Sequence, residues 1–259
     1  RAMAARSTAP IWVNLEYLSA EDWIDGCHGL SSIHPSTGLT KYFWFPGFTT
    51  GTGGLLRSPH ELAQMHDAQS QRETCRQISL FSYEQAGIAS LLDALASDAQ
   101  ASVLNVFAGR SLPDVVRWLG RDLVSGDDVS QGALTLRILP LLPHADYDCL
   151  LASSDLNLVR GEDSLVRAIW AGQAFLWQIY PQDDGAHWPK LQAFLKTTQA
   201  PNVVVQAHMA WNADQPTALP VLTTEHWAQW SAWALTLRQR LQAETDLLTR
   251  LESFVAAHG

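Results

Sequence analysis

The stretch Arg160-Gly161-Glu162-Asp163-Ser164 places a base, a flexible backbone position, two acids and a hydroxyl side by side. It follows a short apolar run and precedes an amphipathic helical pattern, so a strand passes into a helix here. Helix N-terminal amides attract phosphate, and arginine forms charge-assisted hydrogen bonds with it. The stretch therefore predicts a phosphate-binding or catalytic site. The alternative is that both acids only complement the helix dipole, which is worth about 0.3–1 kcal/mol each.

Five apolar strands, each followed by a helical pattern, must position this stretch. The predicted strands cover residues 77–83, 101–107, 134–142, 156–159 and 174–180, and the helices that follow them cover residues 85–97, 112–124, 145–154, 162–172 and 185–198. Near-continuous apolar strands that alternate with helices are typical of a parallel sheet covered on both faces. The pattern predicts an α/β, Rossmann-like domain.

Aromatic side chains stand at the ends of these strands. In a doubly wound sheet, ligands bind beyond the carboxyl ends of the strands where the strand order reverses, usually between the first and fourth strands. The first predicted strand ends in Phe81 and Tyr83, the fourth in Arg160 and the fifth in Tyr180. Aromatic rings stack well on a base. Polar residues are common at strand ends in any case, but this set predicts a nucleotide ligand.

The stretch FPGFTTGTGGLLR, residues 45–57, is also unusual. It contains neither the GxGxxG fingerprint nor a GK[ST] phosphate loop. We predict a glycine-rich turn before a helix, with a backbone cradle facing a cleft as the alternative.

Composition limits the possible functions. The 259 residues are 47% hydrophobic and 17% charged, as in a globular core. The net charge of -9 argues against a general nucleic-acid or anionic-membrane surface, because both need clustered Lys and Arg. No apolar run reaches the roughly 20 residues that span a bilayer, and no signal-peptide pattern is present. We predict a cytoplasmic protein that binds neither nucleic acid nor membrane.

The cysteines and histidines do not form a recognisable metal motif. Cys27, Cys75 and Cys149 are widely spaced, which predicts buried thiols in a reducing compartment. The nine histidines show neither an HExxH motif nor a Cys/His cluster. We therefore predict no structural zinc.

Four stretches that occur in order suggest a family. They are WVNLEYLSAEDW, FPGFTTGTGGLLR, DLNLVRGEDSLVRAIWAG and FLWQIYPQ. Together they resemble the arginine rhamnosyltransferases that modify bacterial elongation factor P (EarP), from about residue 10 to the C-terminus. The resemblance implies a GT-B glycosyltransferase with two Rossmann-like domains. It also implies dTDP-β-L-rhamnose as donor, an arginine of translation elongation factor P as acceptor, inversion at the anomeric carbon and no metal.

The resemblance further implies roles for individual residues. Phe81 and Tyr83 are expected to pack on the nucleotide. Glu162 corresponds to the essential carboxylate of the family's RGEDS motif, and we expect Glu162, Asp163 and Arg160 to be catalytic. The residues expected to hold the diphosphate end and the rhamnose are Arg160, Asp163, Ser164 and Tyr180.

The sequence also departs from the family pattern. Family members carry an Asp-Asn-Tyr-Gly-Asp-type motif near the N-terminus, whose aspartates engage the acceptor arginine, and nothing here matches it. The chain begins at Arg1, so we expect it to lack the start of the first domain and to bind donor without necessarily catalysing. We expect residues 1–73 to be the rest of the acceptor-side domain, residues 74–223 the nucleotide-sugar-binding domain, and residues 224–259 a C-terminal helix packing back across the domains.

Two other readings stay open at this point. The first is a non-catalytic nucleotide-sugar-binding domain. The second is a generic Rossmann oxidoreductase or methyltransferase, which is disfavoured because no glycine-rich fingerprint follows the first strand.

In the C-terminal helix an apolar stripe predicts packing rather than a cofactor site. It comprises Trp227, Trp230, Ala234, Leu237, Leu241, Leu248, Leu251 and Val255.

Overall fold

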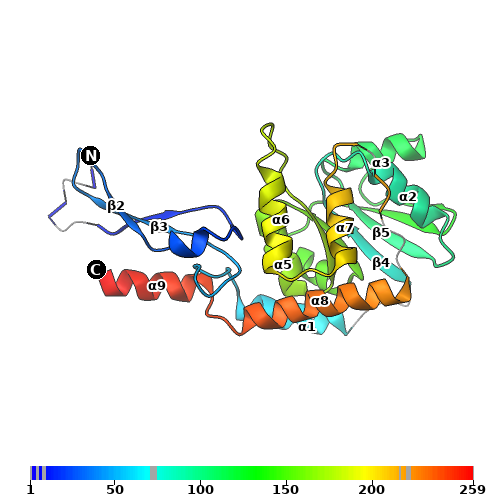
Figure 1. Cartoon of the computed structure of the whole chain (residues 1–259). Helices are drawn as coiled ribbons and strands as arrows, with labels where there is room; N and C mark the ends of the chain where they lie inside the picture. The colour runs from blue at the N-terminus through cyan, green and yellow to red at the C-terminus, as the bar shows by residue number, and fades with distance from the viewer. Residues whose placement is uncertain are drawn as a thin grey trace. The chain divides into compact units, whose positions relative to one another are not determined.

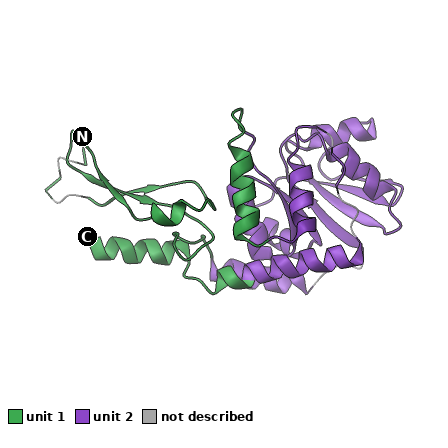
Figure 2. Cartoon of the chain, in the orientation of Figure 1, with its two compact units in different colours: residues 1–57, 182–199, 239–259 green, residues 58–181, 200–238 purple. Residues whose placement is uncertain are grey.

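The computed structural model describes residues 2–3, 6–7, 10–70, 75–215, 217–219 and 223–258. The chain divides into two compact units, shown in different colours in Figure 2. Unit 1 comprises residues 1–57, 182–199 and 239–259, and unit 2 comprises residues 58–181 and 200–238. The expected domain boundary at residues 73 and 74 lies outside the described residues. Within the described part of the chain, no helix is long and apolar enough to cross a membrane.

Unit 2 is built on a six-stranded sheet with the order β6-β7-β5-β4-β8-β9. Its strands are β4 (Arg76–Leu80), β5 (Ser102–Phe107), β6 (Asp128–Gln131), β7 (Leu134–Leu139), β8 (Leu156–Arg160) and β9 (Ala174–Gln178). The five predicted strands are parallel, and the first and fourth, β4 and β8, are neighbours. The α/β class and the predicted position of the switch point are confirmed.

Strand β6 was not predicted. It pairs antiparallel with β7 at the edge of the sheet. Its sequence DVSQ is short and mostly polar because an edge strand buries little side-chain surface, so it carries no apolar signal.

The helices of unit 2 follow the predicted alternation (Figure 1). They are α1 (Pro59–Gln69), α2 (Ile88–Ala96), α3 (Leu112–Leu119), α4 (His144–Ser153), α5 (Gly161–Ala171), α7 (Asn202–Trp211) and most of α8 (Thr224–Gln242). Strands β5 and β9 are buried at every residue, as expected when both faces of a sheet are covered. Helix α5 ends at Gly172, whose φ of 68° is the left-handed conformation that favours glycine.

Unit 1 contains a small three-stranded sheet. Its elements are β1 (Trp12–Leu15), the 3-10 turn η1 (Ile24–Gly26), β2 (Ser31–Ile33), β3 (Thr40–Trp44), α6 (His187–Thr197) and α9 (Leu247–His258). Strand β3 lies in the middle, parallel to β1 and antiparallel to β2. Helix α6 belongs to this unit although it follows β9 in sequence, because Phe194 packs on Phe48 with ring centroids 5.2 Å apart. The units are therefore discontinuous in sequence, unlike the continuous segments that we expected.

The single helix expected over residues 224–259 is two helices, α8 and α9. Asp246 separates them, because its carboxylate accepts hydrogen bonds from the Thr249 amide at 3.1 Å and hydroxyl at 2.7 Å, as an N-cap does. In α8 the stripe residues Trp230, Ala234, Leu237 and Leu241 are buried, as predicted, and Trp227 is half-buried. In α9 the prediction is wrong for Leu248 and Val255, which are 51% and 40% exposed.

Candidate functional site

Strand register brings the predicted site residues to one edge of unit 2. Leu80 of β4 pairs with Leu158 of β8, and the Phe81 amide donates a hydrogen bond to the Leu158 carbonyl at 2.9 Å. Arg160 pairs with Gln178 at the end of β9. The Tyr83 amide in turn donates to the Gln178 side-chain oxygen at 2.8 Å. Three strand ends distant in sequence thus become neighbours at the predicted switch point.

Arg160 lies against two aromatic rings of this edge. Its guanidinium carbon is 4.5 Å from the ring centroid of Phe81 and 4.7 Å from that of Tyr83. Such contacts stabilise a cation without neutralising it. The buried Nη1 atom has no hydrogen-bond partner among the described residues. Tyr180 joins the group, because its ring centroid is 5.5 Å from that of Tyr83.

The backbone at the start of α5 is suited to a close approach. Gly161 is the first residue of the helix and has a φ of 64°, in the left-handed region where side chains are strained. A Cβ atom at this position would lie 3.2 Å from the Tyr83 hydroxyl oxygen. The Gly161 carbonyl accepts a hydrogen bond from Trp177 Nε1 at 2.7 Å, which fixes the turn.

The three residues that follow have different surroundings. Glu162 is half-buried, and its charge contributes to raising the pKa of Tyr83, where burial is the largest cause and Arg160 acts in the opposite direction. Asp163 is exposed and forms an ion pair with Arg167 at 2.9 Å. Ser164 is buried. The structure thus brings every predicted site residue to one edge but gives the two carboxylates unlike environments.

Sequence reasoning missed Tyr147, Asp148 and Arg167, which surround this edge. The Tyr147 ring lies 5.7 Å from that of Phe81, and burial raises the pKa of its phenol. Arg167 donates from Nη1 to both carboxylate oxygens of the buried Asp148. The only sequence signal for the pairs that Arg167 forms was its spacing of four residues from Asp163 on one helix.

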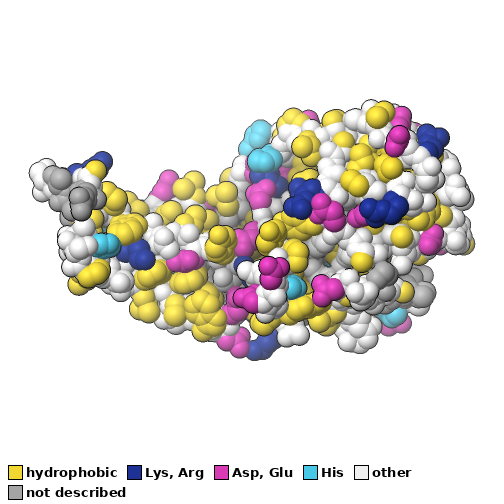
Figure 3. Space-filling model, turned by 90° about the horizontal axis from the view of Figure 1, so that it is seen from above, with side chains coloured by type: hydrophobic (Ala, Val, Ile, Leu, Met, Phe, Trp, Pro, Cys, Tyr) yellow, Lys and Arg dark blue, Asp and Glu magenta, His cyan; other side chains and the backbone are white. Residues whose placement is uncertain are grey.

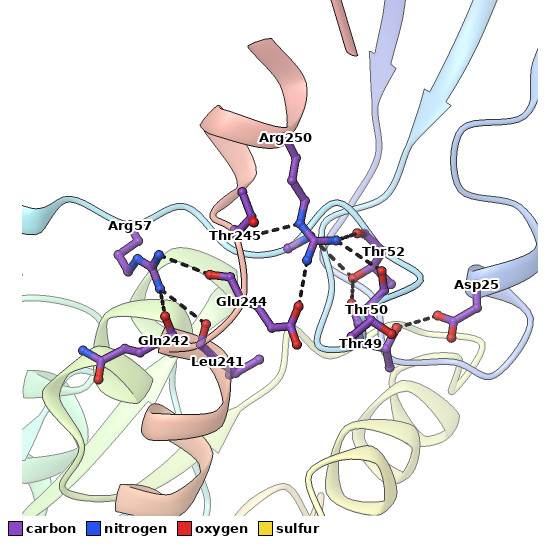
Figure 4. Close-up of polar contacts among 11 residues, drawn as sticks. Asp25, Thr49, Thr50, Thr52, Arg57, Leu241, Gln242, Glu244, Thr245 and Arg250 are labelled. Atoms are coloured by element: carbon purple, nitrogen blue, oxygen red, sulfur yellow. Dashed lines mark hydrogen bonds and ion pairs between the residues drawn. The ribbon is translucent and has the colours of Figure 1, made fainter. Parts of the chain in front are cut away.

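The glycine-rich stretch of residues 45–57 is a packed turn of unit 1. A Cβ atom on Gly53 would lie 2.4 Å from Trp44 Nε1, and one on Gly51 would lie 2.7 Å from the Asp25 carboxyl carbon. Figure 4 shows Arg250 donating to the carbonyls of Thr50 and Thr52, at 3.2 and 2.8 Å. The turn precedes helix α1, as predicted. Ser58 caps the start of that helix. Its glycines allow close packing of protein on protein.

Other features of the described residues add little to the site. No group of three or more His, Cys, Asp or Glu side chains among them is arranged to hold a metal ion. The three cysteines are free thiols and are only partly buried, so the prediction of buried thiols is wrong. On the face shown in Figure 3, basic side chains lie in small separate groups beside acidic ones.

Comparisons with known proteins agree with the fold and identify the family. Residues 1–256 match the family described as Elongation-Factor P (EF-P) rhamnosyltransferase EarP. A protein-arginine rhamnosyltransferase of Pseudomonas putida is 44% identical, over 98% of this chain and 73% of its own length. One of Pseudomonas aeruginosa is 43% identical, over 76% of this chain and 56% of its own length.

A solved structure gives the same result. This structure is described as the structural basis for EarP-mediated arginine glycosylation of translation elongation factor EF-P. It superposes with a TM-score of 0.71 at 27% identity, covering 95% of this chain and 99% of that one. Together the matches confirm the predicted enzyme class, a protein-arginine rhamnosyltransferase. The chain therefore belongs to the EarP family of elongation factor P rhamnosyltransferases.

Proposed function

We propose that this chain binds dTDP-β-L-rhamnose at the edge of unit 2 where Arg160 lies. We further propose that the protein transfers rhamnose to an arginine of elongation factor P in the cytoplasm. Family membership supports the reaction and the partner. The observation that supports the donor site is the environment of Arg160. Its buried Nη1 has no hydrogen-bond partner among the described residues, and its guanidinium lies against the rings of Phe81 and Tyr83. A diphosphate supplies the acceptor oxygens that such a guanidinium needs.

Each of the three parts of the donor is expected to bind a different pair of residues. Phe81 and Tyr83 would pack on the nucleotide, as aromatic rings commonly do with bases. Arg160 and Ser164 would hold the diphosphate at the start of α5, where amides and the dipole favour negative charge. Tyr180 and Asp163 would contact the sugar end. Because Arg160 and the helix supply positive charge, donor binding is expected without divalent metal.

The chemistry assigns different tasks to the charged residues. The acceptor guanidinium is protonated at neutral pH, since arginine has a pKa above about 12, and must lose a proton to attack. A carboxylate that orients it and accepts that proton is therefore needed, and Glu162 is the proposed group on this chain, with Asp163 beside it. A bond forms between the arginine nitrogen and the anomeric carbon as the bond to the diphosphate oxygen breaks, with inversion. Arg160 would stabilise the departing dTDP.

Calorimetric titration tests the donor site directly. We expect dTDP to bind with unchanged affinity in EDTA and more tightly than UDP or NAD. Loss of dTDP binding in EDTA would contradict the metal-free site. Tighter binding of NAD than of dTDP would instead favour the oxidoreductase reading.

A further inference from the structure

Arg167, in the second turn of α5, joins three groups that flank the proposed donor site. Its Nη1 donates to the two Asp148 oxygens at 3.1 and 2.9 Å, and its Nε donates to Asp163 at 2.9 Å. Its Nη2 lies 3.2 Å from Nδ1 of His144. Because a guanidinium only donates, His144 Nδ1 is the acceptor and the ring carries its proton on Nε2.

These bonds join the starts of two helices whose preceding strands are not neighbours in the sheet. His144 and Asp148 lie on α4, whose strand β7 is separated from β8 by β5 and β4. Asp163 lies in the first turn of α5, directly after β8. No ladder therefore joins β7 directly to β8, and the fork of Arg167 spans the two helices.

The contacts with the three partner residues differ in what they contribute. The side chains of Asp148 and Arg167 are 1% and 13% exposed, so their ion pair is buried. Removing one partner would leave the other as a buried charge without a counter-ion. Asp163 is 68% exposed, and His144 is exposed as well. Hydrogen bonds to exposed groups add little to stability. The contact with Asp148 is therefore the one that matters for stability. The bonds to Asp163 and His144 chiefly fix the orientation of those two side chains.

We propose that Arg167 is a positioning residue for the nucleotide-sugar donor, which orients Asp163 and the Nε2–H of His144 toward the site. This inference rests on the proposed donor site. Arg167 acts through these neighbours, while Arg160 is the expected contact to the diphosphate. A lysine in place of Arg167 keeps the charge beside Asp148 but loses the planar fork, so it cannot reach all three partners.

The test uses dTDP as probe, with binding measured by calorimetry and melting by circular dichroism. We expect Arg167→Lys to fold and to bind dTDP about tenfold more weakly than the wild type, because the Nε2–H of His144 is no longer directed at the diphosphate. Tenfold is the scale of one lost hydrogen bond to a charged group. A double variant, Arg167→Met with Asp148→Leu, removes the buried pair together and avoids a stranded carboxylate. It is also expected to weaken dTDP binding about tenfold.

Arg76→Lys is the matched control. The Arg76 side chain is also 13% exposed, and it pairs with Asp98 at 2.7 Å. It begins β4, at the end of the strand opposite Phe81. We expect this variant to bind dTDP as the wild type does.

The outcomes separate the two proposals. If the wild type binds no dTDP, the proposed donor site fails and this inference fails with it. If the wild type binds dTDP and both Arg167 variants bind it equally well, only the positioning role is overturned. An equal loss of affinity in Arg76→Lys would show a general structural effect and would also overturn it.

Discussion

Arg160 shows how a single residue can keep its charge available for a ligand. An ion pair with a neighbouring carboxylate would satisfy the guanidinium but would compete with an incoming phosphate. Contacts with the rings of Phe81 and Tyr83, at 4.5 and 4.7 Å, hold it in place and leave its charge unneutralised. Arg167, by contrast, is saturated by carboxylates and a histidine. The two arginines of this edge are therefore suited to binding and to positioning, respectively.

Glu162 is the residue whose replacement best separates catalysis from helix capping. If it only complements the helix dipole, Glu162→Gln costs under about 1 kcal/mol of stability and leaves transfer intact. If it acts on the acceptor arginine, rhamnosyl transfer falls about a hundredfold or more. We expect the second result, in an assay of the protein that carries this chain together with any residues that precede it.

Glu225 provides the control for Glu162. It is an acidic residue in the first turn of α8, so Glu225→Gln makes the same change in charge at another helix start. We expect it to transfer rhamnose as the wild type does. Near-normal transfer by Glu162→Gln would return Glu162 to a capping role.

The glycine-rich turn matters at the scale of an element, because it must fit closely beside β3. We expect Gly53→Ala to lower the free energy of unfolding by about 1–3 kcal/mol, since the new methyl would overlap Trp44 Nε1. A methyl group on Gly26 would meet no atom within 4 Å, so Gly26→Ala should stay within about 0.5 kcal/mol of the wild type. Urea unfolding of both variants measures this, and equal stabilities would show that the turn can relax.

Packing between α7, α8 and β9 makes stability depend on pH through His208. This ring is buried among Phe175, Trp230 and Trp233, and its Nδ1 donates to the Val204 carbonyl at 2.9 Å. Burial lowers the pKa of His208 to about 4, against the opposing effect of that hydrogen bond.

The folded and unfolded chains therefore differ in proton binding between about pH 4 and the ordinary histidine pKa near 6.5. In that window the unfolded chain binds a proton that the folded chain lacks, so the free energy of unfolding falls as pH decreases, by about 3 kcal/mol in all. We expect His208→Leu to remove most of this dependence in urea titrations at pH 7 and pH 4.5. Replacing the exposed His60 by Gln is expected to leave it unchanged, and an unchanged slope in His208→Leu would contradict the assignment.

At the scale of the whole molecule, the proposed donor site lies within one compact unit. Every residue proposed to contact the donor belongs to unit 2. A ligand present at about a hundred times its dissociation constant stabilises the state that binds it by about 2.7 kcal/mol. We expect saturating dTDP to slow amide hydrogen exchange at the ends of β4 and β8 and at the start of α5. Exchange in β1 and β3 of unit 1 is expected to stay unchanged, and protection limited to unit 1 would place the donor elsewhere.

The sequence was sufficient for the main framework of the nucleotide-binding unit. Apolar runs alternating with helical patterns predicted five parallel strands, because buried parallel strands must be apolar on both faces. The usual strand order then placed Phe81, Tyr83, Arg160 and Tyr180 at one edge, and the observed pairing of β4 with β8 agrees. The local sequence was sufficient for these predictions, since the ends of strands and the starts of helices can be recognised from the residues next to them.

Only the tertiary structure decided what surrounds those residues. Tyr147 and Asp148 come from a helix whose strand is not a neighbour of β8, so no spacing in the sequence relates them to Arg160. The assignment of α6 to unit 1 and the break between α8 and α9 depend on side chains such as Phe48 and Asp246, which act across the fold or at a single cap. Sequence by itself determined the family, the five parallel strands and the edge at which Phe81, Tyr83, Arg160 and Tyr180 meet, because these follow from local patterns. Which residues surround Arg167, which arginine is available to a ligand and which glycines are packed depend on contacts between distant residues, and only folding creates those contacts.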